Sequence, residues 1–122
     1  MAETLDLATI GELLDAVGGD GAFVDELVDT FLADAPSLLD AVDEAVAAGD
    51  AGALVGPAHT LKGNSLTLGA LELAAVARSL EEEGRQADLS RAADHAALAR
   101  VELGRVADAL QDARETRWAA PA

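Results

Sequence analysis

DGAFVDELVDTFLADAPSLLDAVDEAVAAGD, residues 20–50, decides the fold class. Its apolar residues return at steps of three and four, which places them on one face of a helix. Asp20 is placed to cap this helix, and Gly49 and Asp50 form the next break. Pro36 predicts either a kink in one long helix or a junction between two helices. The predicted buried face is Val24, Val28, Phe31, Ala35, Leu38, Val42 and Ala45.

The chain on either side divides into helices by the same signals. Thr9 and Glu12 form a capping-box pattern for a short first helix, which Gly18 and Gly19 end. A third helix is predicted over residues 51–68, followed by a turn at Gly69, and a fourth over 70–83, with Gly84 as its stop. A fifth begins near Asp88. The predicted buried face of the third helix is Leu54, Ala58, Leu61, Ser65 and Leu68. That of the fourth is Leu73, Ala77 and Leu80. That of the fifth is Leu89, Ala92, Ala96, Ala99, Leu103, Val106 and Leu110.

These elements predict an all-α fold, because no segment alternates with the period of two that a strand requires. Short connections between long amphipathic helices favour an antiparallel up-down four-helix bundle with an additional short N-terminal helix. The 122 residues form one expected domain over 1–122, with a core of about residues 6–113 and a frayed tail over 114–122. For Trp118 the sequence leaves open a place in that tail or over one end of the bundle.

Charge and composition exclude several classes of function. The net charge of −15 and pI of about 4.1 oppose binding to nucleic acid or to an anionic membrane surface. The absence of cysteine excludes disulfides and thiolate metal sites. With no signal-peptide pattern and no long apolar run, we expect a cytoplasmic protein. Residues 1–61 contain 13 acidic residues and neither Lys nor Arg, which indicates a solvated surface or an electrostatic filter on partners.

His59 is the candidate reactive residue. It lies one position off the predicted buried face of its helix, at the edge of that face or towards solvent. Val55, Lys62, Gly63 and Leu66 follow the same side at helical spacing. A neutral imidazole is a good nucleophile near neutral pH. Lys62, the only lysine of the chain, lies one turn away and would stabilise negative charge on a group that reacts with the imidazole.

The neighbours of His59 suit the close approach of a partner. Gly63 has no side chain and gives clearance, and a glycine within a helix costs about 0.5–1 kcal/mol relative to alanine. Val55 and Leu66 offer apolar contact around the reactive group. Each of these features has a structural interpretation when taken alone. A histidine beside an apolar face, an exposed lysine and a helix glycine are all ordinary.

Together the residues resemble a known family. Ala58-His59-Thr60-Leu61-Lys62-Gly63-Asn64-Ser65, Leu68-Gly69-Ala70 and Leu80-Glu81 are similar to the signature of histidine phosphotransfer (HPt) domains. The resemblance covers roughly residues 6–113. It implies that His59 is phosphorylated, that Lys62 steadies the phosphoryl group, that Gly63 gives the partner clearance and that Gly69 makes the turn. Glu81 is interpreted as structural. Pro57 departs from the pattern and puts the local helix geometry in doubt.

The resemblance also implies a mechanism and partners. An HPt protein takes a phosphoryl group from an aspartate of a receiver domain, in a hybrid kinase or response regulator, and passes it to another receiver. The Mg²⁺ belongs to the receiver, so no cofactor is expected on this chain. We expect a phosphocarrier, not an enzyme, because neither a phosphate-binding loop nor a kinase nucleotide-binding box occurs in the sequence. A monomer is expected. The initial Met1 favours a free-standing protein over a piece of a larger kinase.

Two other functions remain to be weighed. The first is a non-catalytic acidic interaction module that binds a partner through the His59 face. The second is a metal protein or enzyme that uses His59 with carboxylates, but no Glu-x-x-His pattern occurs to supply ligands. The only other histidine, His95, has no Lys-Gly companion and is predicted to be a surface residue.

Overall fold

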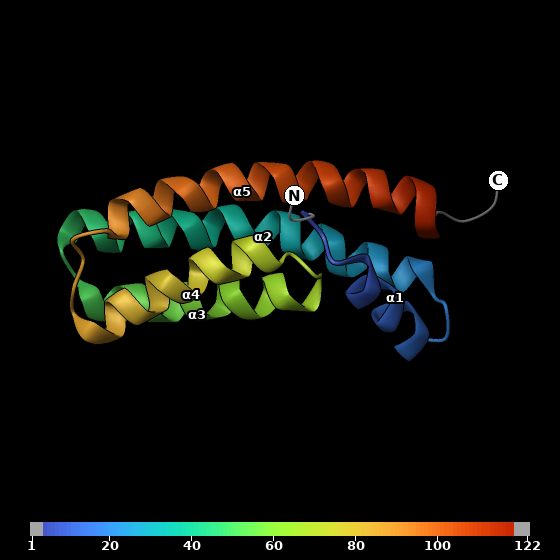
Figure 1. The fold of residues 1–122 in the computed structure, drawn as a ribbon, viewed down its shortest axis with the longest axis horizontal. Coiled ribbons are helices and arrows are strands. Elements are labelled where there is room, and N and C mark those ends of the chain that lie inside the picture. The colour runs from blue at the N-terminus through green and yellow to red at the C-terminus, as the bar shows by residue number, and fades with distance from the viewer. Residues whose placement is uncertain (1–3, 119–122) are drawn as a thin grey trace.

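The computed structural model describes residues 4–118 and is helical throughout, with no strand in that range. Figure 1 shows the long helices lying lengthwise beside one another, with the chain turning back at each connection, and the short first helix beside the start of the second. The predicted all-α class is confirmed. The elements are α1 (Leu7–Ala16), α2 (Gly21–Ala48), α3 (Ala51–Thr67), α4 (Leu71–Gln86), α5 (Ala92–Ala113) and a π-helical turn (Arg114–Trp118).

Aspartate side chains start the first three helices. As predicted, Asp20 caps α2 by accepting from the Phe23 N–H at 3.2 Å, and Asp50 caps α3 by accepting from the Ala53 N–H at 3.0 Å. The predicted capping box of Thr9 and Glu12 is wrong, because α1 begins earlier. Asp6 is its cap and accepts from the Ala8 N–H and from the Thr9 hydroxyl, both at 3.1 Å.

α2 is one uninterrupted helix of 28 residues. Pro36 lies inside it on the exposed face, where the loss of one backbone hydrogen bond does not divide the helix. The buried face is the predicted one with a single correction: Leu39 is buried in place of Leu38, which is only partly buried. The step of four from Ala35 and of three to Val42 brings Leu39 onto the seam.

Gly84 was predicted to stop α4, and this prediction is wrong. α4 continues to Gln86 and ends at Ala87, which adopts the left-handed conformation with φ 52°. Gly84 is buried, and a Cβ built on it would lie 2.9 Å from both the Ala51 carbonyl oxygen and Val55 Cγ2. Its missing side chain therefore lets α4 approach the start of α3 closely.

α5 begins at Ala92, four residues later than predicted. Asp88 instead organises the preceding turn by accepting from the Ser90 N–H at 3.2 Å and the Ser90 hydroxyl at 2.7 Å. The chain continues past α5 as a π-helical turn where the sequence predicted the frayed tail. Arg114 anchors the start of that turn through a 2.9 Å ion pair with Asp29 of α2. Residues 119–122 and the side chain of Trp118 lie outside the described structure.

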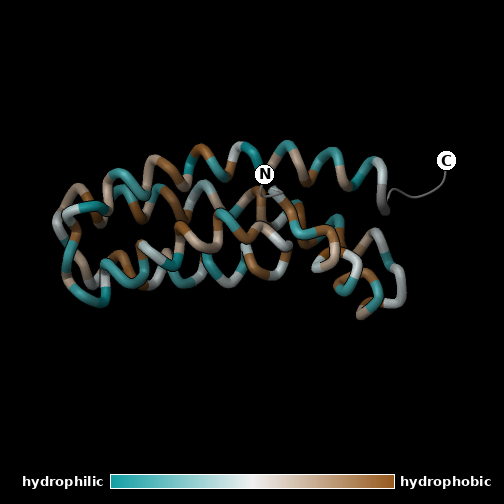
Figure 2. The backbone as a smooth tube through the Cα atoms, viewed as in Figure 1, coloured by the Kyte–Doolittle hydropathy of each residue, from teal (hydrophilic) through white to brown (hydrophobic). Residues whose placement is uncertain are grey.

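The core is aliphatic, as the low aromatic content requires. Figure 2 shows hydrophobic and hydrophilic residues alternating along the helices, which marks them as amphipathic. No helix within residues 4–118 has the length and apolar character needed to cross a membrane. The buried faces predicted for α3 and α4 are confirmed. Within the described part of the chain, the buried polar or charged residues are Ser65, Glu81 and Glu102. Glu81 leads to the candidate site, because a buried carboxylate needs partners.

Candidate functional site

α3 presents His59 to solvent. The helix is continuous from Ala51 to Thr67, so Pro57 does not displace His59 from it. Leu54, Ala58 and Leu61 face the core, and the His59 side chain lies beside that face with 62% of its surface exposed. The imidazole is therefore held on a regular helix and is accessible to a partner.

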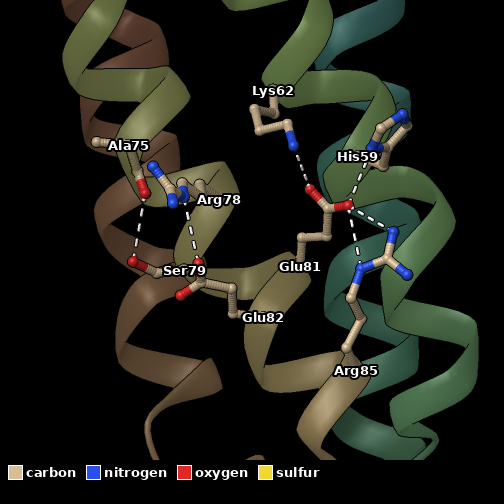
Figure 3. Close-up of polar contacts among 8 residues, drawn as sticks. All are labelled: His59, Lys62, Ala75, Arg78, Ser79, Glu81, Glu82 and Arg85. Atoms are coloured by element: carbon tan, nitrogen blue, oxygen red, sulfur yellow. Dashed lines mark hydrogen bonds and ion pairs between the residues drawn. The ribbon is translucent and has the colours of Figure 1, made fainter.

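Glu81 of α4 lies beneath the imidazole and binds it. Its side chain is only 6% exposed, and its Oε2 lies 2.9 Å from His59 Nδ1. Figure 3 shows two cations reaching the same carboxylate. Lys62 Nζ lies 2.7 Å from Oε1, and Arg85 Nη2 lies 2.8 Å from Oε2. One buried carboxylate thus holds the histidine and two basic side chains together.

The charges of this cluster fix the state of Glu81. The ion pair with Lys62, followed by the contact with Arg85, lowers the pKa of Glu81 from 4.5 to about 2, and His59 adds to this effect. Burial acts in the opposite direction but is outweighed. Glu81 is therefore ionised at neutral pH and can only accept hydrogen bonds.

An ionised Glu81 selects the tautomer of His59. Because the carboxylate only accepts, His59 Nδ1 carries the hydrogen and donates it. The lone pair of the neutral ring is then on Nε2, the nitrogen that Glu81 does not bind. This arrangement prepares a nucleophile with a fixed ring orientation and with cations beside it.

The other predicted residues around His59 differ in accessibility. Gly63 is exposed, and a Cβ built on it would meet no atom within 4 Å. Leu66 is 48% exposed. Val55 is half-buried with its Cγ2 directed at Gly84, so it offers less free surface than the sequence indicated. Gly69 makes the turn between α3 and α4 with φ 73°.

The turn at Gly69 also anchors the N-terminal segment. The Asp6 N–H donates to the Gly69 carbonyl at 2.7 Å, and a Cβ on Gly69 would lie 2.7 Å from the Asp6 carbonyl oxygen. Both the positive φ and this close approach require glycine. Ser65, whose role the sequence left open, donates to the Leu61 carbonyl within α3 at 2.7 Å.

Sequence reasoning missed two parts of the site. Glu81 was predicted to be structural, and the sequence pattern assigned no role to Arg85. The available signal was their spacing of four residues, which places both on one face of α4. Among the described residues, no group of three or more His, Cys, Asp or Glu side chains is arranged to hold a metal ion.

His95, predicted to be a surface residue, is half-buried at the surface. Its side chain is only 18% exposed, and its Nδ1 lies 2.7 Å from Glu83 Oε2. The pair joins the first turn of α5 to the end of α4. His95 thus has a carboxylate partner but little access to solvent.

Comparison with known proteins identifies the class of protein that this fold and site define. The Hpt domain family model matches residues 26–116, so the chain belongs to the Hpt domain family. It is a histidine phosphotransfer protein of phosphorelays. Among solved structures it is similar to histidine-containing phosphotransfer protein B (HptB) from Pseudomonas aeruginosa PAO1, with 31% identity and a TM-score of 0.84. That match covers 94% of this chain and 97% of the other. No curated protein sequence matches the chain.

Proposed function

We propose that His59 accepts a phosphoryl group from the aspartyl phosphate of one receiver domain and delivers it to the aspartate of another. One observation carries this assignment. His59 is an exposed imidazole whose Nδ1 is bound by a buried, ionised carboxylate, which leaves Nε2 as the free nucleophile. Family membership supports the reaction class. The antiparallel arrangement of α2–α5 serves as the rigid support that positions His59.

In the proposed step the Nε2 lone pair attacks phosphorus in line with the bond to the receiver's aspartate. The N–P bond forms as the P–O bond breaks, and the aspartate leaves as a carboxylate with that electron pair. The ring gains positive character, which Glu81 stabilises through the Nδ1–H that it already accepts. Transfer to the second receiver reverses these changes.

Lys62 and Arg85 would offset the charge of the phosphoryl group. In the unphosphorylated protein both are paired with Glu81, on the side of the molecule where the imidazole is exposed. A dianionic group on Nε2 attracts these cations, and charge-assisted hydrogen bonds to its oxygens would replace part of their contact with the carboxylate. Arg85 is 59% exposed and has room to turn.

The receiver would provide Mg²⁺, which neutralises charge on the transferring oxygens. This chain acts in the proposal as a carrier, with neither ATP binding nor autokinase activity, and as a cytoplasmic monomer. His59 as nucleophile, with Lys62 and Arg85 beside it, supports this role, because a carrier needs a positioned nucleophile and positive charge near it.

The test is phosphotransfer from an ATP-charged hybrid kinase, or from a phosphorylated receiver with Mg²⁺, to the wild-type protein, His59→Gln and His95→Gln. We expect acid-labile, base-stable label on the wild type and on His95→Gln, and none on His59→Gln. Label that persists on His59→Gln would overturn the assignment. Wild-type protein that binds receivers and never takes label would support a non-catalytic interaction module instead.

A further inference from the structure

The contact between Glu81 and His59 crosses from one helix to another. Figure 3 shows Glu81 extending from α4 towards His59 and Lys62, which belong to α3. The Glu81 carboxylate lies 2.9 Å from His59 Nδ1 and 2.7 Å from Lys62 Nζ. Both distances therefore depend on how closely α3 and α4 approach each other.

Gly84 brings the backbones of these two helices together one turn from the pair. It follows Glu81 by three residues on α4, and its neighbour on α3, Val55, precedes His59 by four. A Cβ built on Gly84 would lie 2.9 Å from the Ala51 carbonyl oxygen and 3.3 Å from the Val55 backbone nitrogen. Backbone atoms cannot turn aside as the end of a flexible side chain can, so this spacing requires glycine.

Three other glycines inside helices have no such neighbour. A Cβ built on Gly56 or Gly63 of α3, or on Gly104 of α5, would meet no atom within 4 Å. These three glycines are exposed, whereas Gly84 is buried. The close approach at Gly84 is thus a specific feature of the interface between α3 and α4.

An alanine at position 84 would change the helix spacing by an amount that matters for the pair. Ordinary contact with a Cβ begins at 3.4 Å, so the helices would separate by about 0.5 Å at this point. An equal increase in the distance from His59 Nδ1 to Glu81 would exceed the range of about 2.7–3.2 Å that is usual for an N–H···O hydrogen bond. Glu81 has little room to compensate, because its side chain is only 6% exposed.

We propose that Gly84 is a positioning residue for phosphotransfer: its missing side chain sets the separation of α3 and α4 at which Glu81 holds the His59 ring. The inference rests on the proposed function. Reacting groups must be held within about 0.5 Å of their productive geometry, so a small change in helix spacing is sufficient to slow the reaction. A glycine with no side chain to contact the phosphoryl group thereby controls the orientation of the nucleophile.

Single-turnover transfer at a series of receiver concentrations separates the maximal rate from the half-saturating concentration. Gly84→Ala should lower the maximal rate about tenfold at an unchanged half-saturating concentration. Gly104→Ala, the matched change at an exposed helix glycine, should alter neither quantity. In the Glu81→Gln background Gly84→Ala should slow transfer less than about twofold, because the residue through which it acts is already lost. Equal slowing in both backgrounds would overturn the proposal and leave Gly84 with a role in stability alone.

The imidazole nitrogens report the same effect without a receiver. At about pH 9, where imidazoles are neutral, the ¹⁵N shifts of His59 in the wild type and in Gly104→Ala should show the hydrogen on Nδ1. Gly84→Ala should move His59 towards the other tautomer. Wild-type shifts in Gly84→Ala would contradict the proposal. Because this measurement needs no phosphoryl donor, it distinguishes failure of the proposal from failure of the proposed function.

Val55→Ala covers the case in which Gly84→Ala fails to fold. It removes Val55 Cγ2, which would also lie 2.9 Å from a Cβ on Gly84, and leaves the Ala51 carbonyl oxygen in place. The double variant Val55→Ala/Gly84→Ala should therefore fold and still transfer roughly fivefold more slowly than Val55→Ala alone. Equal rates and equal His59 shifts in these two variants would show that the helix spacing at position 84 does not act on the site.

Discussion

Two histidine–glutamate pairs in this protein use the same atoms and have different surroundings. His59 Nδ1 lies 2.9 Å from Glu81 Oε2, and His95 Nδ1 lies 2.7 Å from Glu83 Oε2. The His59 ring is largely exposed above a buried carboxylate that also binds Lys62 and Arg85, whereas the His95 ring is mostly buried. Within residues 4–118, no Lys or Arg pairs with Glu83.

The proposed phosphorylation of His59 therefore rests on more than a carboxylate that holds the ring, since His95 has such a carboxylate too. In both pairs the carboxylate can orient the ring, but of the two only His59 combines this with a largely exposed ring and with two basic side chains on the same carboxylate. His95 instead ties α5 to the end of α4. Three features therefore separate the two pairs: exposure of the ring, burial of the carboxylate and the presence of basic neighbours.

Exchanging each glutamate for glutamine tests the role of the carboxylate, and we expect the largest effect here. Glu81→Gln removes the charge that fixes the His59 tautomer and leaves Lys62 and Arg85 without their shared partner. The maximal rate of single-turnover transfer should fall roughly 10- to 100-fold, the size of effect seen when the carboxylate that orients a metal-bound histidine is lost. Glu83→Gln should leave that rate unchanged.

In this view Glu81 is a positioning residue. Glu81→Gln should therefore lower the maximal transfer rate and leave unchanged the receiver concentration at which half of that rate is reached. Glu81→Asp keeps the charge and should recover part of the rate. Equal slowing by Glu81→Gln and Glu83→Gln would mean that the two pairs differ less than the structure indicates.

Substitution of Lys62 tests how much the basic side chains beside His59 contribute to the rate of transfer. Lys62→Gln removes one charge beside the phosphoryl group, and we expect the transfer rate to fall about tenfold, equivalent to about 1.4 kcal/mol. Lys62→Arg keeps the charge and should restore most of the rate. If Lys62→Gln transfers as fast as the wild type, Arg85 alone supplies the required positive charge.

Acid stability tests the charges around Glu81 in the absence of a receiver domain. The pKa of Glu81 is lowered from 4.5 to about 2, chiefly by Lys62 and Arg85. Because the folded-state pKa lies below the ordinary value, the ionised form stabilises the fold fully above about pH 4.5, and this stability is lost as the pH falls towards 2. The free energy of unfolding, measured in urea between about pH 6 and about pH 3, should decrease less for Glu81→Gln than for the wild type. An equal decrease in the free energy of unfolding for Glu81→Gln and the wild type would show that the cluster does not stabilise the ionised carboxylate.

Local sequence patterns were enough to predict most of the fold. Asp20 and Asp50 cap the helices they were assigned to, and the apolar spacing found nearly every buried residue of α2 and α3. The prediction that Gly84 ends α4 was wrong because a buried glycine at a helix crossing has the same sequence signal as one that ends a helix. Pro36 left open whether this region forms one helix or two. Only its exposed position in the structure shows that a single helix, α2, tolerates it.

The site was only half predictable. His59, Lys62 and Gly63 share one helix, so their spacing reveals their relation. Glu81 and Arg85 belong to α4, and Glu83 meets His95 across another interface. These contacts depend on how α4 is rotated against α3 and α5, which no local pattern encodes. The partial burial of His95 was missed for the same reason.

The smallest effect is expected from replacing two exposed helix glycines. The pair separates the contribution of a glycine to transfer from its contribution to stability. Gly63 and Gly104 are both exposed inside helices, and a Cβ on either would meet nothing within 4 Å. Alanine at each position should therefore stabilise the protein by about 0.5–1 kcal/mol, because it reduces the entropy lost when the helix forms. Urea unfolding of Gly63→Ala and Gly104→Ala measures this gain. Only Gly63 lies beside His59, where a methyl group would hinder the receiver's approach, so Gly63→Ala should also transfer more slowly while Gly104→Ala keeps the wild-type rate. Equal rates for the two variants would mean that the clearance at Gly63 has no part in docking, and that this glycine, like Gly104, lowers helix stability without a function in transfer.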